Sequence, residues 1–428
     1  MPLTPIATSA WSVARWVDFL IVSLMWGFTT PLAHPTGASV TWTMPRYAPG
    51  SPLLRTVPLG GDPSAIAVDI RHRRVFVVNQ GNFTTGNGVV SGRGSVSVLD
   101  AATGRLLRTF SLGTNSYLSG GAALGIRTAG SPVGIDGRTN RLFVETSDGD
   151  NHIDSYRVHM LNATTGAVLR IIRAAGALVV DEALGRVYLG GGTILDARTG
   201  AVVDVFRGGS AFAVASSLGR LYVGDYNGNV TILAATTGKT LSVIHVGDAV
   251  FNLAVDEQAD RLLVMHGAGN EDFTVGGSAS IYDATTGKLI HDKTQIGWTL
   301  EGIDEQTHHI LAVAIVSSNT LAGPVSVMTA DTRSGKRLHE VTIGSTIHGN
   351  GAIAIDQGRS HALVTIADGG THFGSNTLSV VDTRTGRLLR TLTLGAGPST
   401  VAFDPQTDRF FVANQQANTV DILDAARL

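Results

Sequence analysis

The chain has 428 residues, a formal net charge of −2 and no cysteine, with 43% hydrophobic and 15% charged residues. This composition is typical of a packed globular protein and excludes a disordered chain. The absence of cysteine excludes disulfides, zinc–thiolate sites and thiol catalysis. The 32 Lys and Arg against 34 Asp and Glu give no basic excess for nucleic acid, so we expect no nucleic-acid partner. The one dense basic run, residues 71–74, is predicted to be a solvated turn.

The first 45 residues differ from the rest of the chain. Arg15 precedes a short apolar run over 19–28, and small residues follow soon after. This pattern is typical of an export signal, and Trp11, Trp16 and Trp26, which lie in or before this run, also suit an interfacial membrane anchor. The run is shorter than the roughly 20 residues of a membrane span. We predict a signal peptide or N-terminal anchor with linker over 1–45, and a secreted, periplasmic or cell-surface domain over 46–428; a disordered cytoplasmic tail is the alternative for the first segment.

From residue 46 onward the sequence is repetitive. VSVLDAATGRLLRTFSLG at 96–113 returns nearly unchanged as LSVVDTRTGRLLRTLTLG at 378–395. An apolar strand followed by Asp, two residues, Thr or Ser and Gly, or a variant of this pattern, occurs eight times, ending at Gly104, Gly166, Gly200, Gly238, Gly287, Gly335, Gly386 and Leu428. Asp bonds its own backbone two residues on, and Gly accepts a positive φ. We therefore predict that these Asp residues shape hairpins and do not catalyse.

Two further short apolar strands precede each copy, as in TVAFDPQTDRFFVAN at 400–414. Four short strands at a mean spacing of about 48 residues fit the blade of a β-propeller. The chain stops after the third strand of the last unit, whereas LLRTVPLGG at 53–61 matches LLRTLTLGAG at 388–397. We predict an all-β propeller of eight four-stranded blades, with residues 53–59 supplying the missing outer strand and closing the ring.

Two segments carry a family resemblance. Phe76-Val-Val-Asn79 and Phe411-Val-Ala-Asn414, each followed by a loop and an Asp-containing turn, resemble the YVTN-type propeller repeat over residues 53–428. The resemblance implies a propeller of the superfamily that includes the quinoprotein amine dehydrogenase β-chain and lactonase-like proteins. Seven blades is the commonest number there and is the alternative to eight. The resemblance implies no single function, since such proteins include surface proteins, lactonase-like enzymes and many of unknown role.

The two faces of the predicted ring differ. The Asp-x-x-Thr-Gly turns share one face, here called the turn face. Loops between second and third strands, and connections from each outer strand to the next inner strand, share the opposite face, here called the insertion face. All long insertions lie there: 80–94, 114–130, 145–157, 266–278, 315–324 and 367–377. Elaborated loops on a rigid scaffold usually carry binding, so we place function on the insertion face, with unselected loop growth as the alternative.

One of these insertions is acidic. Asp148, Asp150 and Asp154 lie close together with a Gly between them, and such oxygen ligands suit Ca²⁺. An ordinary solvated acidic loop is the alternative. No other cofactor is expected.

The connections into the inner strands place polar residues around the channel mouth on the insertion face. We predict ligand-binding residues at Asp62, Ser64, Trp298 and Asn350. Trp298 is the only Trp after residue 42 and would serve as a stacking platform, with core packing as the alternative.

The same mouth contains the candidate catalytic residues Glu301, His348 and Asp248. Glu301 aligns with apolar residues such as Ile66 and Ile353 in the inner strands of other units. A carboxylate at an apolar position must be paired, protonated or in contact with water. A structural carboxylate is the alternative.

Together these features predict an exported, monomeric binding or scaffold protein that contacts a small-molecule ligand or protein partner through its insertion face. A lactonase-like hydrolase or lyase acting at the channel mouth is the alternative. A quinoprotein dehydrogenase is disfavoured, because the turns lack the following Trp that docks neighbouring blades in those enzymes, and adjacent cysteines are absent. Neither Gly-x-Ser-x-Gly nor His-Glu-x-x-His occurs.

Overall fold

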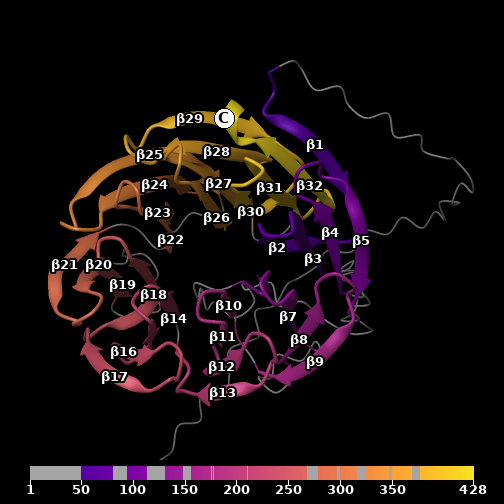
Figure 1. The fold of residues 1–428 in the computed structure, drawn as a ribbon. Helices are drawn as coiled ribbons and strands as arrows, with labels where there is room; N and C mark the ends of the chain where they lie inside the picture. Colours follow the sequence, from indigo (N-terminus) through magenta and orange to yellow (C-terminus); the bar gives the residue numbers. More distant parts are fainter. Residues whose placement is uncertain are drawn as a thin grey trace, which may run out of the picture. The chain divides into compact units, whose positions relative to one another are not determined.

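The computed structural model describes residues 50–80, 94–112, 131–147, 156–174, 176, 178–209, 211–267, 278–295, 299–315, 323–346, 349–368 and 376–428. The chain divides into two units, Met1–Arg46 and Tyr47–Leu428, and only the second contains described residues. These form eight four-stranded antiparallel sheets arranged as the blades of a ring (Figure 1). The predicted eight-bladed all-β propeller is confirmed, and the seven-bladed alternative is wrong. No helix in this described part is long and apolar enough to cross a membrane.

The blades are numbered 1 to 8 in the order of their inner strands. The inner strands are β2 (Pro63–Asp69), β6 (Val133–Asp136), β10 (Leu178–Asp181), β14 (Ala211–Ala215), β18 (Ala249–Asp256), β22 (Thr299–Asp304), β26 (Gly349–Asp356) and β30 (Pro398–Asp404). All of them except β14 end at a buried Asp. The second strand of each blade begins at Arg or His. These strands are β3 (Arg74–Asn79), β7 (Arg141–Ser147), β11 (Arg186–Leu189), β15 (Arg220–Gly224), β19 (Arg261–Gly267), β23 (His309–Ile315), β27 (His361–Asp368) and β31 (Arg409–Asn414).

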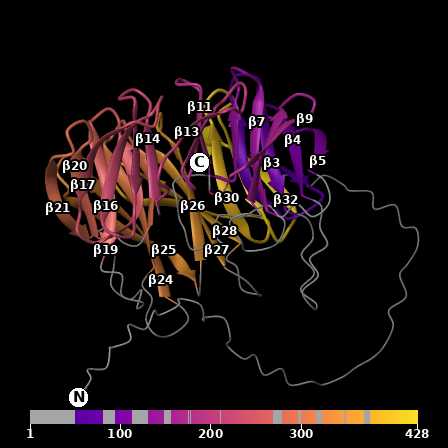
Figure 2. The same cartoon turned by 90° about the horizontal axis from the view of Figure 1, so that it is seen from below.

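The third strands lead into the hairpin turns of the turn face: β4 (Ser95–Asp100), β8 (Tyr156–Asn162), β12 (Thr193–Asp196), β16 (Asn229–Ala234), β20 (Ser278–Asp283), β24 (Gly323–Asp331), β28 (Thr377–Asp382) and β32 (Thr419–Asp424), which is followed by a short 3-10 turn, η2 (Ala425–Arg427). The outer strands are β5 (Leu106–Ser111), β9 (Val168–Arg173), β13 (Val202–Val205), β17 (Thr240–His245), β21 (Leu289–Gln295), β25 (Arg337–Thr346), β29 (Leu388–Thr393) and β1 (Leu53–Pro58). In Figure 2, β24 and β25 extend beyond the neighbouring blades.

The hydrophobic core lies between blades. Both faces of each sheet are apolar, so consecutive residues of a second strand are buried, as in Val75 to Val78. The buried side chains form eight clusters, each shared by two adjacent blades. In the cluster between blades 1 and 2, for example, Phe76 and Val98 pack with Leu142 and Leu161. Each blade is therefore stabilised chiefly by its two neighbours.

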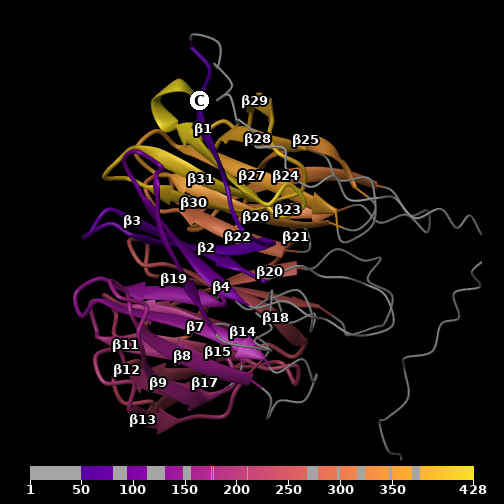
Figure 3. The same cartoon turned by 90° about the vertical axis from the view of Figure 1, so that its right-hand side faces the viewer.

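The N-terminal strand β1 completes blade 8. It pairs antiparallel with β32, with Val57 opposite Val420, and Figure 3 shows it running beside the C-terminal strands. Val57 also packs in the cluster that contains Val75 and Val77 of blade 1. Pro58 lies exposed at the outer edge, where its missing N–H is harmless.

On the turn face, Asp and Thr lock several of the hairpins in the same way. The Asp100 carboxylate accepts hydrogen bonds from the Thr103 hydroxyl at 2.7 Å and the Thr103 N–H at 2.8 Å. Asp196 and Asp283 repeat this with the Thr three residues on. The Thr hydroxyl lowers the pKa of all three carboxyls. The carboxylates of these Asp residues therefore accept hydrogen bonds that shape the hairpins, as predicted.

The same turns also accept hydrogen bonds from the neighbouring blade. An Arg near the middle of an outer strand donates from Nη1 to a backbone carbonyl in the next blade, in the pairs Arg55–Thr103, Arg108–Thr164, Arg170–Thr199 and Arg390–Arg427. These contacts are here called interblade latches. The latches explain why LLRT recurs beside the Asp-containing turns. The carbonyls of the turn accept a hydrogen bond from the Arg of the preceding blade, and the Arg of LLRT donates one to the following blade.

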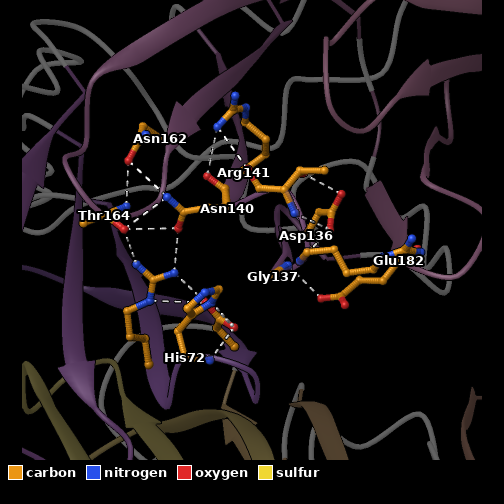
Figure 4. Close-up of polar contacts among 12 residues, drawn as sticks. His72, Asp136, Gly137, Asn140, Arg141, Asn162, Thr164 and Glu182 are labelled. Carbon is orange, nitrogen blue, oxygen red and sulfur yellow. Dashed lines mark hydrogen bonds and ion pairs between the residues drawn. The ribbon is translucent and has the colours of Figure 1, made fainter.

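The basic run at 71–74 is only partly a solvated turn. The side chain of Arg74 is 11% exposed and bonds the buried Asp69 carboxylate at 2.6 Å. Its other contacts cross to blade 2, to the Asn140 Oδ1 at 2.7 Å and the Thr164 Oγ1 at 3.0 Å. Figure 4 shows Asn140 and Thr164 between His72 on one side and Arg141 on the other. Arg74 is thus an interblade contact, and the solvated-turn prediction is wrong for this residue.

Deletion of residues 46–60 removes β1 and leaves β32 as an exposed apolar edge. We expect aggregation or a fall of many degrees in Tm, since unpaired edges recruit other chains. Differential scanning calorimetry and size-exclusion chromatography measure both, and deletion of residues 1–45 alone is the control. A monomeric 46–60 deletion with parental Tm would contradict closure of the ring by β1.

Substitution Gly386→Val should destabilise the fold by roughly 2–4 kcal/mol. Gly386 has φ +64°, and an added Cβ atom would overlap the His339 side chain of blade 6. Gly60→Val is the control, because nothing lies within 4 Å of the position of its Cβ. Urea unfolding compares the two variants, and equal stabilities would show that the turn glycine has no conformational role.

Candidate functional site

Four inner strands carry a β-bulge near the insertion face. The extra residues, read from the strand registers, are Ser64 in β2, Phe251 in β18, Glu301 in β22 and Ser399 in β30. A bulge redirects a side chain and is frequent beside functional sites. At this end of four inner strands the pairing therefore departs from a regular ladder.

The bulge changes the interpretation of Glu301. Leu300 lies opposite Ala312, as Ile66 lies opposite Val77, and Glu301 is the additional residue between Leu300 and Gly302. The alignment of Glu301 with Ile66 is therefore one residue out of register. The argument that a carboxylate replaces an apolar inner-strand residue is wrong, because Leu300 occupies that position.

Blade 5 contains a buried polar network that reaches the mouth. His266, at the insertion-face end of β19, has a side chain that is 1% exposed. Its Nε2 atom lies 2.7 Å from the Ser280 Oγ, and its Nδ1 atom lies 3.3 Å from the Asp248 Oδ2. Ser280 in turn donates to the Asp292 Oδ1 at 2.8 Å. Since Ser280 has only one hydrogen to donate, the His266 Nε2 atom must carry the hydrogen of its contact.

A second bulge brings the outer strand into this network. Ala279 pairs with Thr294 and Ile281 with His291, so Asp292 and Lys293 together face Ser280. Lys293 has φ +54°, a strained conformation for a residue with a side chain. Its N–H donates to the Ser280 Oγ at 3.2 Å, and its Nζ atom lies 3.8 Å from the Asp248 Oδ2. Strain of this kind is a recognised feature of functional sites.

Asp248 and Lys293 form the exposed end of the network. Their side chains are 36% and 60% exposed. The His266 Nδ1 atom lies 3.3 Å from one carboxylate oxygen of Asp248 on the buried side. This end of blade 5 therefore presents the Asp248 carboxylate beside the Lys293 ammonium, with the exposed Asp292 carboxylate next to Lys293 bonded to Ser280.

Two aromatic rings lie at this corner. Tyr226, in the turn between β15 and β16 of blade 4, is 55% exposed and is the only aromatic among the exposed large hydrophobic residues of the described ranges. Its ring centroid lies 6.2 Å from that of the bulge residue Phe251, at 60°. Gly228, two residues after Tyr226, packs against the backbone of Asp248. The aromatic pair and the ion pair are thus parts of one corner between blades 4 and 5.

The order Asp248, His266, Ser280 is that of a hydrolytic triad, but the chemistry differs. Ser280 is fully buried and directs its hydrogen to Asp292 and not to His266. A nucleophilic Ser must lie open to substrate and give its proton to His. Ser280 is therefore not placed to attack a substrate.

The corner departs from the repeat at one residue. Asn79 in blade 1 and Asn414 in blade 8 occupy the strand position of His266, opposite Pro63 and Pro398 as His266 is opposite Val250. The Asn79 amide donates to the Ser97 Oγ at 3.0 Å, and the Asn414 amide to the Thr419 Oγ1 at 3.1 Å. The structural role of this Asn is to tie second and third strands together. Blade 5 keeps the tie and adds a contact to Asp248.

The predicted site residues are not gathered at one place. Asp248 lies in blade 5, whereas Asp62 and Ser64 lie in blade 1, four blades away around the ring. Asp62 is half-buried, and burial raises the pKa of its carboxyl. Ser64 donates weakly to the Val78 carbonyl at 3.5 Å. Blade 1 therefore forms a separate part of the mouth.

Other predicted residues fall wholly or partly outside the description. Trp298, His348 and the calcium candidates Asp148, Asp150 and Asp154 lie outside the described residues. Only the backbones of Glu301 and Asn350 are described, in β22 and β26. Their predicted roles remain predictions. Among described residues, no group of three or more His, Asp or Glu side chains is placed to hold a metal ion.

Sequence reasoning missed His266, Tyr226, Phe251, Asp292 and Lys293. A signal existed for His266, which stands where FVVN and FVAN have Asn. Tyr226 stands in the tight turn Asp-Tyr-Asn-Gly, which presents an aromatic without an insertion. The bulges at Phe251 and beside Lys293 have no comparable signal in the sequence.

Comparison with known proteins supports the fold alone. No protein-family model and no curated protein matches the chain, so the YVTN-type resemblance stays a prediction. Similar solved structures include hydrazine synthase of Kuenenia stuttgartiensis, with a TM-score of 0.51 and 12% identity over 86% of this chain and 97% of that one. The computationally designed Ika8 protein has a TM-score of 0.56 and 19% identity over 86% and 98%. BamB from Moraxella catarrhalis has a TM-score of 0.56 and 14% identity over 87% and 99%.

Substitution His266→Ala should destabilise the protein by about 1–3 kcal/mol, because it leaves a cavity and removes a buried hydrogen bond. His266→Asn should cost less than half as much, since Asn in blades 1 and 8 makes the equivalent bond. Urea unfolding followed by circular dichroism measures both. If Asn is as damaging as Ala, the assignment of His266 to the Asn position of the repeat is wrong.

Proposed function

We propose that this protein is an exported, non-enzymatic binding or scaffold protein that contacts its ligand or partner through the insertion face. The observation that carries the proposal is the corner of blades 4 and 5, where Tyr226 contacts Phe251 and the turn that holds Tyr226 packs against the backbone of Asp248. A propeller fold with BamB among its structural neighbours is consistent with a binding role. Export rests on the N-terminal sequence alone.

The corner has the physical properties of a binding site. It presents apolar and polar groups side by side, which is the usual composition of ligand sites. Its polar end is positioned from the interior by His266, so little ordering is needed on binding. On the turn face, by contrast, the carboxylates and carbonyls of the hairpins are bonded to Thr hydroxyls and to the Arg residues of the latches.

A panel of soluble amino acids, amines, organic acids, nucleotides and saccharides tests this proposal. Each is added to the full-length protein in a thermal-shift assay, and the footprint of each stabilising compound is mapped by hydrogen exchange. We expect protection of peptides covering 223–230 and 246–267. Protection confined to the hairpin turns of the turn face or to the outer strands would overturn the proposal.

The double variant Tyr226→Ala, Asp248→Ala should weaken binding of such a compound at least about tenfold, while Tm falls little because both side chains are partly exposed. Leu241→Ala is the matched control, since Leu241 is exposed on the outer strand β17 of the same blade as Tyr226. A larger loss of affinity in the control than in the double variant would contradict the assignment of the corner.

A further inference from the structure

The ligand chemistry of the corner follows from its charge balance. Asp248 and Lys293 lie 3.8 Å apart, so their charges largely cancel, and the exposed Asp292 carboxylate next to Lys293 already accepts the Ser280 hydroxyl hydrogen. A cationic or anionic ligand would have to break this pair before it gained an ionic contact, and both ions are exposed enough for water to screen the gain. The corner therefore favours an uncharged ligand.

The polar groups of that ligand are also constrained. A carboxylate only accepts hydrogen bonds, and an ammonium only donates them. Asp248 and Lys293 side by side therefore match groups that can donate to one and accept from the other. Two neighbouring hydroxyls on one ligand meet this requirement.

The apolar part of the corner is small and rigid. The Tyr226 ring is exposed, whereas Phe251 contacts it edge-on and is only partly exposed. The turn that holds Tyr226 is fixed by the Asp225 carboxylate, which accepts from the N–H groups of Asn227 and Asn229, both at 2.9 Å. One pre-positioned ring suits a ligand with one flat apolar face. A partner helix would need a longer apolar groove.

We propose that this corner binds a neutral saccharide, with a sugar ring packed on Tyr226 and neighbouring hydroxyls bonded to Asp248 and Lys293. The inference rests on the proposed binding function and specifies its ligand class. In this arrangement the C–H face of a pyranose packs on the Tyr226 ring while hydroxyls at its edge form hydrogen bonds with Asp248 and Lys293. His266 acts as a positioning residue through Asp248.

The test uses the full chain with cellotetraose, maltotetraose, chitotetraose and mannotetraose, followed by isothermal titration calorimetry and ligand-observed NMR. Tetragalacturonate and spermidine serve as the anionic and cationic comparisons. We expect at least one neutral tetrasaccharide to bind with a Kd of about 1 mM or below, and tighter than both charged compounds. Absence of binding by all four at about 10 mM would overturn the saccharide assignment.

Variants then locate the site. Tyr226→Ala should weaken binding about tenfold or more, whereas Tyr226→Phe, which keeps the ring, should change it less than about threefold. Asp248→Asn should also weaken binding, because the amide no longer offers two acceptor oxygens. Val205→Ala, at an exposed position of β13, is the control and should bind as the parent does. Parental affinity in Tyr226→Ala would overturn the proposal.

The outcomes separate this inference from the proposed function. If spermidine or another non-saccharide protects 223–230 and 246–267 and no saccharide binds, the binding function stands and the saccharide class is wrong. If a saccharide binds but protects only the turn face, both proposals fail.

Discussion

Packing of every blade on both faces is the constraint on which the rest of the structure depends. A four-stranded sheet with two apolar faces is unstable alone, and the eight clusters of buried side chains each lie between adjacent blades. The hairpin turn supports this packing, because its Asp and Thr fix the backbone while its carbonyls receive an Arg from the preceding blade. A motif that serves two blades leaves little freedom for variation, which accounts for the near identity of residues 96–113 and 378–395.

This constraint acts differently on the two faces of the ring. On the turn face, carboxylates and carbonyls are engaged in hairpins and latches, such as Asp100 with Thr103 and Arg108 with Thr164. On the insertion face the ends of second and third strands need only be connected, so loop length and side chains can change without loss of packing. Binding groups can therefore be placed there at low cost in stability.

Blade 5 shows how such a site arises within a repeat. His266 retains the tie from second to third strand that Asn makes in blades 1 and 8, and its second nitrogen contacts Asp248. Bulges at Phe251 and beside Lys293 then shift the strand register next to this network. A local departure from an otherwise consistent pattern, together with a strained residue, is the expected signature of a functional site.

The sequence by itself determined the all-β class, the eight blades and the identity of the turns. These features depend on local chemistry, because a hairpin that needs Asp and a left-handed Gly displays both residues in most of the copies. Only the tertiary structure decided that Glu301 is a bulge residue, that Arg74 bridges two blades, and that Tyr226 meets Phe251 beside Asp248. Bulges shift strand register by one residue without a sequence signal, and contacts between blades depend on the curvature of the whole ring. Which side chains meet at the mouth is therefore set by register and packing, which no local pattern records.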